Sequence, residues 1–260
     1  MSDQRATRVI LGIVLAAAAI GIIALLARNG GGKAPTDPEK PATPPLATDT
    51  PPSPIVDIDP PEAADPVRAI LNAAALPTSD ELRALLRNNA DARAKTADGR
   101  TAILAAAETG AAASVELLLI HGASADDADI DGVTPMIAAI RGPGPERVEK
   151  LLILLNAGAT PDRADVMGRT PLHHACARAD DDGVIVLLAD AGVDLDARDD
   201  QGRTPLMLAA LRADADAALL LLSRGADAAI ALPDGRAAAD LALEGGHDRL
   251  AQALREASSR

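Results

Sequence analysis

Three side chains that could do chemistry lie close together in the chain: His173, His174 and Cys176. Imidazole and thiolate groups are zinc ligands, and a cysteine activated by a histidine is a common enzymatic nucleophile. His173 and Cys176 are three residues apart, so they share one face of a helix. Two ligands do not complete a metal site, and a buried cysteine behaves as a small apolar residue. A structural role therefore competes with a metal-binding or catalytic role.

Carboxylates gather in two clusters, which consist of Asp126, Asp127, Asp129 and Asp131 and of the run 180–182. Calcium is bound by oxygen ligands, but neither cluster has the twelve-residue loop with its central glycine and terminal glutamate. We therefore interpret these residues as solvated turns. No phosphate-binding loop and no G-x-S-x-G or H-E-x-x-H motif is present. We predict that the chain is not an enzyme and has no catalytic, cofactor-binding or metal-binding residue.

The two histidines belong to a motif that recurs along the chain. The stretch from Met167 to Leu172 reads as a glycine turn followed by a Thr-Pro helix start. Glycine tolerates a positive φ, threonine caps a helix, and proline suits the first helical position. The residues equivalent to Thr170 stand at positions 101, 134, 170, 204 and 237, spaced by 33, 36, 34 and 33 residues. A nearly constant period of this length indicates a solenoid.

A second motif, an apolar helix ending in glycine, runs in step with the first. Its terminal residues are Gly122, Gly158, Gly192 and Gly225, with Asn89 one repeat earlier. Glycine or asparagine at this place ends a helix in the left-handed conformation. The longer spacings place insertions at residues 142–145 and near residues 180–182, between the two helices of a repeat. They are either neutral surface insertions or binding loops.

These motifs resemble the ankyrin-repeat pattern, which is roughly D-x-x-G-x-T-P-L-H-x-A-A followed by a second helix ending L-L-x-x-G-A-D. The resemblance runs from about Val67 to the end of the chain. It implies an all-α ankyrin-repeat solenoid of helix-turn-helix repeats with short β-turn tips. His173 falls on the family's usual histidine position, where the side chain supports the turn. The expected units are an N-terminal cap at 67–95, repeats at 96–128, 129–164, 165–198 and 199–231, and a C-terminal cap at 232–260.

Composition restricts the partners of such a solenoid. The formal net charge is −13 and the chain contains no Phe, Tyr or Trp. Nucleic-acid binders carry basic patches and stack bases on aromatic rings, so we expect no nucleic acid as partner. The core must be built from Ala, Leu, Ile and Val. The single cysteine excludes an internal disulfide and does not report the cellular compartment.

The N-terminal part of the chain predicts a membrane anchor. A short polar tail at 1–8 precedes an uncharged apolar run at 9–27, which is long enough to cross a bilayer as a helix. A cleavable signal peptide is the alternative, but its apolar region would be shorter and would end at a small-x-small site. Arg5 and Arg8 favour a cytoplasmic N-terminus. The repeats would then lie outside the cytoplasm, which is the periplasm in a Gram-negative bacterium.

The stretch 28–66 predicts a disordered linker. Its first residues are rich in glycine, and ten prolines lie between positions 35 and 61. Such a composition favours an extended chain without a core. The linker is either a spacer between membrane and repeats or a ligand for proline-binding modules.

Cations recur at places that face the concave side of ankyrin solenoids, namely after the turn glycine and at the end of the first helix. The first place holds Arg100, Arg169, Arg203 and Arg236, and the second holds Glu108, Arg141, Arg178 and Arg212. Asp98, Asp131, Asp200 and Asp234 are the candidates to neutralise this row. The arginines either bind an acidic surface of a partner or reflect a residue that is common in the family.

We predict a single-pass membrane protein that serves as a protein-protein interaction scaffold or adaptor and binds its partner through the concave surface. A spacer without a specific ligand is one alternative, and a metal or catalytic site at His173, His174 and Cys176 is the other. The sequence does not indicate the oligomeric state.

Overall fold

The computed structural model describes residues 65–178 and 181–259, all of which belong to one compact unit of the chain. These residues form helices that come in pairs. The first helices of the pairs are α2 (Pro66–Ala74), α4 (Ala102–Glu108), α6 (Pro135–Arg141), α8 (Pro171–Cys176), α10 (Pro205–Leu211) and α12 (Ala238–Glu244). The second helices are α3 (Asp80–Arg87), α5 (Ala112–Ile120), α7 (Arg147–Asn156), α9 (Asp182–Asp190), α11 (Ala215–Ser223) and α13 (Asp248–Ser258).

The predicted membrane helix at 9–27 lies outside the described residues, as does the predicted linker up to residue 64. Among the helices that are described, none is both long and apolar enough to cross a bilayer. Helix α2 begins at Pro66, one residue before the predicted start of the repeat domain at 67. The helix starts there because the Asp65 carboxylate accepts a hydrogen bond from the Val67 N–H at 3.0 Å.

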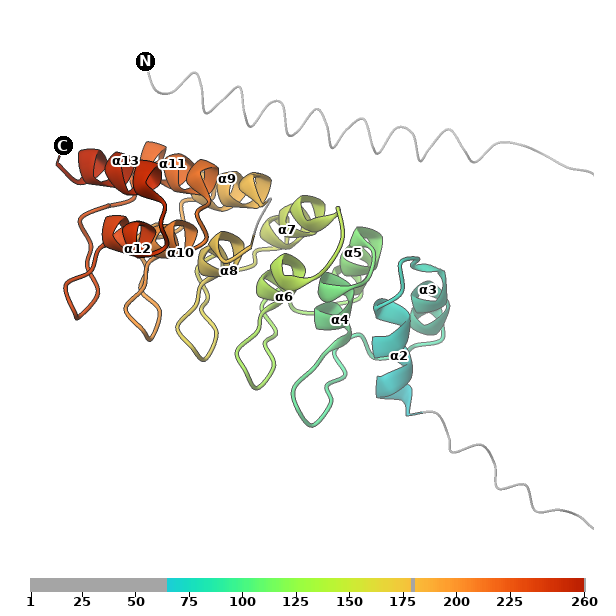
Figure 1. Ribbon diagram of the computed structural model, residues 1–260. Helices are drawn as coiled ribbons and strands as arrows, with labels where there is room; N and C mark the ends of the chain where they lie inside the picture. Colours follow the sequence, from blue (N-terminus) through green and yellow to red (C-terminus); the bar gives the residue numbers. More distant parts are fainter. Residues whose placement is uncertain (1–64, 179–180, 260) are drawn as a thin grey trace, which may run out of the picture. The chain divides into compact units, whose positions relative to one another are not determined.

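Each pair of helices packs mainly on the neighbouring pairs, as expected of a solenoid. The first helices contact one another in chain order from α2 to α12, and α5, α7, α9 and α11 form a second row (Figure 1). Between residues 65 and 259, leaving out the gap at 179–180, the only extended pairings are the isolated bridges Lys95–Thr101 and Ala231–Ala237. The predicted helical solenoid is confirmed for this part of the chain.

The core is aliphatic and follows the first helices. In α4 every residue from Ala102 to Ala107 is buried, and in α10 every residue from Pro205 to Ala210. The second helices bury one face only, with Leu118, Leu154 and Leu188 at its centre. The small alanine side chains let neighbouring first helices approach closely, so the core fills without aromatic rings.

The helix ends are set by the residues that the sequence motif singles out. The hydroxyl oxygens of Thr101, Thr134 and Thr204 accept hydrogen bonds from the N–H three residues later, at 3.5, 3.3 and 3.3 Å. The predicted left-handed residues have positive φ, and they are Gly122, Gly158, Gly192, Gly225 and Asn89. The insertion at 142–145 lies between α6 and α7, as its place in the motif indicates.

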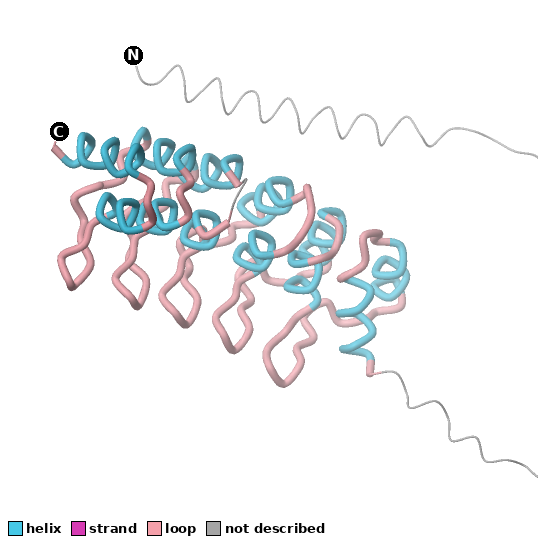
Figure 2. Tube along the Cα trace, viewed as in Figure 1, coloured by secondary structure: helices cyan, strands magenta, loops and turns pink. Residues whose placement is uncertain are grey.

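A hairpin loop precedes the first helix of each pair from α4 to α12, and these loops project in the same direction (Figure 2). Each loop is closed by a hydrogen bond between backbone groups four residues apart, for example Asp165 N–H to the Arg169 carbonyl at 3.0 Å. Neighbouring loops are also joined to each other. The three bonds of this hairpin ladder run from Ile130 N–H to Asp98, from Val166 N–H to Asp131, and from Asp200 N–H to Met167 carbonyls, at 3.2, 3.0 and 3.0 Å.

Two polar side chains, the buried Lys150 and the exposed Glu146, connect α7 to the preceding repeat. The Lys150 side chain is only 4% exposed, and its ammonium group donates to the Ala107 carbonyl at the end of α4 at 3.0 Å. Burial lowers the pKa of Lys150, an effect that the negative charge of Glu146 opposes. The Glu146 carboxylate in turn accepts the Ala112 N–H at the start of α5 at 2.7 Å. Helix ends whose backbone groups lack helical partners are thus satisfied by the next repeat.

The hairpin ladder predicts unequal effects for two glycine substitutions. Gly132 and Gly158 both have positive φ, at +72° and +86°, but a Cβ on Gly132 would lie 3.0 Å from the Val166 nitrogen whereas one on Gly158 meets nothing within 4 Å. Gly158→Ala should lower the free energy of unfolding by about 1–2 kcal/mol, the cost of a left-handed alanine. Gly132→Ala should lower it by at least about 1 kcal/mol more, because the next hairpin must move. Urea unfolding followed by circular dichroism measures both, and equal losses would contradict a tight hairpin ladder.

Candidate protein-binding groove

The eight residues that we predicted to face the concave side, called the groove residues from here on, come from two places in each repeat that face each other. Arg100, Arg169, Arg203 and Arg236 directly follow the turn glycine of a hairpin loop, whereas Glu108, Arg141, Arg178 and Arg212 end a first helix or lie within two residues of its end. The Arg100 guanidinium reaches Glu108 at 2.6 Å, and Arg236 reaches Glu244 at 2.8 Å in the same way. These contacts join the hairpin to the end of the first helix within one repeat. Arg100, Glu108 and Arg141 also line a small cavity of about 110 Å³ together with Asp129 and Asp131.

Most of the arginine row is neutralised, but largely by carboxylates other than those we expected. Among the described residues, Asp98, Asp131 and Asp200 form no ion pair, and only Asp234 binds its arginine, Arg236, at 2.7 Å. The carboxylates that pair with the other row arginines are Glu108, Asp181 and Asp199. Arg100, Arg169 and Arg203 therefore pair with carboxylates at the helix end or at the start of a hairpin, whereas Arg236 also reaches Asp234 at the tip of its own hairpin.

Two arginines of the row keep a free charge. Arg141 and Arg212 are exposed, and neither side chain makes an ion pair or a hydrogen bond within residues 65–178 and 181–259. Arg178, in contrast, donates to the Arg141 carbonyl at 3.0 Å and pairs with Asp181 at 3.3 Å. The groove therefore offers two unpaired cations rather than seven.

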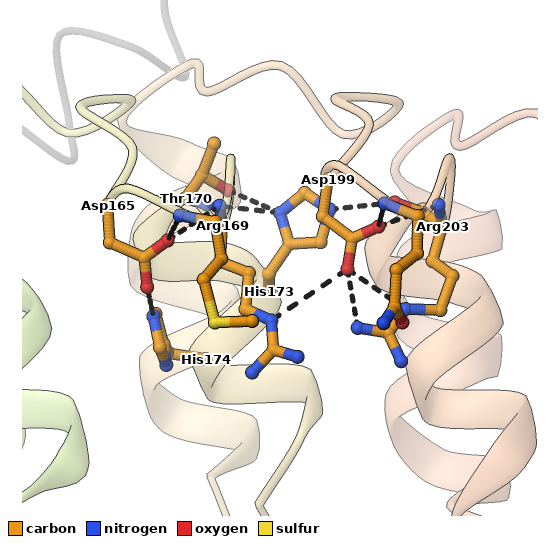
Figure 3. Close-up of polar contacts among 9 residues, drawn as sticks. Asp165, Arg169, Thr170, His173, His174, Asp199 and Arg203 are labelled. Carbon is orange, nitrogen blue, oxygen red and sulfur yellow. Dashed lines mark hydrogen bonds and ion pairs between the residues drawn. The ribbon is translucent and has the colours of Figure 1, made fainter.

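The first residue of a hairpin is the centre of the polar network at α8 and α10 (Figure 3). One carboxylate oxygen of Asp199 accepts the Gln201 and Arg203 N–H groups at 3.0 and 2.9 Å. The other oxygen pairs with the Arg203 guanidinium at 2.6 Å and lies 3.8 Å from Nε of Arg169 in the preceding repeat. Burial alone would raise the pKa of Asp199, but the hydrogen bonds from Arg203 and Gln201 outweigh it and hold this pKa below its ordinary value.

Asp165 occupies the same place one repeat earlier and is built in the same way. Its carboxylate accepts the Met167 and Arg169 N–H groups at 2.9 and 3.0 Å, and its second oxygen accepts from Nε2 of His174 at 2.8 Å. Burial raises the pKa of Asp165, but these hydrogen bonds lower it further than burial raises it. His174 is thus hydrogen-bonded to the first residue of the hairpin, Asp165.

The His173 ring makes contacts with two repeats, and these contacts determine which of its nitrogens carries the proton. Its Nδ1 lies 2.8 Å from the Thr170 hydroxyl and accepts the Thr170 N–H at 3.2 Å, while Nε2 lies 3.0 Å from the Arg203 carbonyl (Figure 3). A backbone N–H can only donate and a carbonyl can only accept, so Nε2 carries the proton and the ring is neutral. Burial lowers the pKa of His173, in agreement with this assignment.

The alternative metal or nucleophile site does not come together around these side chains. Nε2 of His174 is engaged by Asp165 and both nitrogens of His173 are engaged, as described above. The Cys176 side chain is fully buried, and burial raises the pKa of its thiol, which disfavours the reactive thiolate. Within the part of the chain that the structure describes, no three His, Cys, Asp or Glu side chains gather as metal ligands would.

Sequence reasoning missed the residues that organise the groove, Asp165 and Asp199. A signal was present, because Asp stands five residues before the capping threonine in three repeats, at 129, 165 and 199. The sequence also gave little sign of the junction at Asp181, whose carboxylate is 1% exposed and pairs with Arg147 of the preceding repeat at 2.8 Å. Asp181 thereby ties the loop before α9 to the start of α7.

The buried histidines predict an acid-sensitive fold. Burial lowers the pKa of both His173 and His174 from 6.5, so below about pH 6.5 the unfolded chain binds more protons than the folded chain. The free energy of unfolding should therefore be full above this pH and fall as the pH decreases below it. The carboxyl groups of Asp165 and Asp199, whose pKa values lie below 3.8, add their own loss only at lower pH.

The measurement is urea unfolding between pH 7.5 and 5.5. Replacing both residues, His173→Gln and His174→Gln, should lower stability by about 1–3 kcal/mol at pH 7.5. It should also flatten the dependence on pH, because glutamine does not titrate. His121→Gln, which removes an exposed imidazole on another repeat, is the control for loss of a histidine. A wild-type chain that gains stability between pH 7.5 and 5.5 would contradict the prediction.

Comparison with known families agrees with this geometry. The family described as ankyrin repeats (3 copies) matches two overlapping stretches of the chain, residues 70–165 and 144–231. The comparison with curated proteins found no match. The family match extends over more than half of the chain and covers the helix pairs from α2 to α11, but not the last pair, α12 and α13. The chain therefore belongs to the ankyrin-repeat family.

Proposed function

We propose that this chain is a membrane-anchored scaffold that binds a protein partner through the concave side of its repeats. Ankyrin repeats are generally protein-interaction modules and are typically not enzymes. The observation that carries the proposal is the groove itself. Charged side chains from the hairpins and from the first-helix ends meet along one side of the solenoid, on a frame whose helices are buried behind them. A rigid frame of this kind limits the entropy lost when a partner is bound.

The charges that form no ion pair in the groove indicate which kind of partner surface the groove would bind. Arg141 and Arg212 lie at the ends of α6 and α10, and neither forms an ion pair with a carboxylate in the described part of the chain. A guanidinium binds a carboxylate through two parallel hydrogen bonds, so these two residues suit an acidic surface on the partner. The five other arginines already have internal partners and would contribute less, because a partner would have to displace them.

Reversal of the two free charges tests this proposal. The double variant Arg141→Glu and Arg212→Glu should keep its fold, because neither side chain is part of the core. It should reduce partner capture at least about tenfold, which corresponds to about 1.4 kcal/mol. Capture by the unaltered chain should decrease as salt is raised above 0.1 M, because charges about 10 Å apart are then screened. The measurement is crosslinking of the full chain in its native membrane, with partners identified by mass spectrometry.

The control reverses two exposed arginines outside the groove, Arg83 and Arg87 on α3. Capture that falls with the α3 variant and persists with the groove variant would show that the binding face is elsewhere. If the unaltered chain yields no stoichiometric partner under these conditions, the chain is a spacer.

We also propose that the segment 9–27 anchors the chain in the membrane and is not cleaved, with residues 28–64 as the spacer to the repeats. The support for this is the length of the apolar run and the absence of a small-x-small site at its end. The arginines at positions 5 and 8 favour a cytoplasmic N-terminus, which would place the groove outside the cytoplasm. An anchored scaffold would meet its partner at the membrane surface.

The anchor predicts that the chain stays in the membrane pellet after extraction with alkaline carbonate, because a transmembrane helix is not released by the loss of electrostatic contacts. Immunoblotting of pellet and supernatant, with mass spectrometry of the N-terminus, makes the measurement. A chain that begins near Arg28 and appears in the supernatant would identify a cleaved signal peptide.

A further inference from the structure

The tips of the second and third hairpins expose three aliphatic side chains. Ile130 is 69% exposed, Val166 is 62% exposed and Met167 is 48% exposed. The corresponding tip positions in the neighbouring hairpins carry small or polar residues, which are Ala97, Asp98, Asp200 and Gln201. We refer to Ile130, Val166 and Met167 as the aliphatic tip. Large apolar residues that cluster on an otherwise polar surface mark interaction sites.

Backbone hydrogen bonds hold the aliphatic tip in place. The N–H of Ile130 donates to hairpin 1, the N–H of Val166 donates to hairpin 2, and the carbonyl of Met167 accepts from hairpin 4. Each of the three residues therefore takes part in the hairpin ladder described above. A partner would meet a preformed surface and would not need to order a flexible loop.

The charges around the aliphatic tip are negative and unpaired. Asp98, Asp131 and Asp200 are exposed. Among the described residues none of these three carboxylates forms an ion pair, although the hydroxyl of Thr96 donates to Asp98. The ladder places each of them at the side of one aliphatic residue: its bonds join Ile130 to Asp98, Val166 to Asp131, and Met167 to Asp200. The unpaired charges of the hairpin tips are thus negative, whereas Arg141 and Arg212 are cations; Asp131 also lines the small cavity beside Arg141.

We propose that the aliphatic tip binds a partner segment that presents aliphatic side chains flanked by lysine or arginine. The aliphatic side chains would cover Ile130, Val166 and Met167, and the cations would pair with Asp98, Asp131 and Asp200. Apolar burial supplies most of the affinity of such a contact, and the charge pairs select the segment and its orientation. This inference rests on the proposed function, since it names a second surface for the same class of partner.

The methionines of this chain provide the reporter for a test. Met167 is half-exposed at the tip, whereas Met136 and Met207 are buried, at 1% and 0% exposure. We would label the full chain with ¹³C-methyl methionine in zwitterionic lipid nanodiscs and titrate three synthetic peptides of equal length. The first has leucines flanked by lysines, the second has the same leucines flanked by glutamates, and the third has serines in place of the leucines and keeps the lysines.

Only the first peptide should shift the Met167 methyl signal in a saturable manner, while the signals of Met136 and Met207 stay in place. Ile130→Ser with Val166→Ser should weaken binding of this peptide at least about tenfold. Ile120→Ser, which removes an aliphatic side chain that is 72% exposed on α5, should leave binding unchanged. The inference is overturned if the glutamate or the serine peptide shifts Met167 as much as the first peptide, or if no peptide shifts it.

The groove variant separates this inference from the proposed function. Arg141→Glu with Arg212→Glu should leave the response of Met167 to the lysine-flanked peptide intact, because neither arginine belongs to the aliphatic tip. If the aliphatic tip fails to bind the peptide while the groove still captures its partner, that result would contradict the inference about the tip and leave the proposed function of the groove standing. Loss of the Met167 response in the groove variant would show that the groove and the aliphatic tip form one surface, and would overturn the inference of a second one.

Discussion

The hydrogen bond between adjacent hairpins is the contact on which the rest of this structure depends. It runs from the N–H of one hairpin to the carbonyl of the preceding one, and it recurs at Ile130, Val166 and Asp200. It brings the loops so close that the turn position next to it must be glycine, since a Cβ on Gly132 or Gly168 would lie 3.0 Å from a backbone nitrogen of the next hairpin. The ladder ends at Pro233, which stands at the donor position of the fifth hairpin and has no N–H.

The apolar core alone does not fix how one repeat is positioned on the next. Hydrogen bonds and ion pairs between repeats complement it, because they require a defined geometry. Alanine and leucine surfaces can pack at several offsets with similar burial, because the hydrophobic effect depends on area rather than on orientation. The buried contacts of Lys150 with Ala107 and of Asp181 with Arg147 each join two consecutive repeats. Leaving any of these groups unpaired in the interior would cost about 1–3 kcal/mol or more, so they disfavour alternative offsets of the same helices.

Features that depend on adjacent residues could be predicted from the sequence, and contacts between side chains farther apart in the chain could not. The capping threonines and the left-handed glycines depend on a few neighbouring residues, so the motif was sufficient to place them, and Asn89 with them. Which carboxylate pairs with each arginine depends on the distance between the two side chains in the folded chain, and not on their separation in the sequence. Arg100 pairs with a residue eight positions later, and Arg169 lies near Asp199 of the next repeat. Nothing in the sequence neighbourhood of Lys150 indicates that its ammonium group donates to a carbonyl at the end of α4.

The ion pairs of the arginines determine which charges of this chain remain to attract a partner. A row of seven free arginines would oppose the overall charge of −13 and attract acidic proteins to the groove. Five of them are held by internal carboxylates, so within the described residues the charges of this side that form no ion pair include Arg141 and Arg212 and the tip acids Asp98, Asp131 and Asp200. Long-range steering and short-range contact then agree for a partner that approaches with basic residues, because both act at Asp98, Asp131 and Asp200. The two free arginines in the groove act only at close range, where they can select among partners that the tips have already attracted.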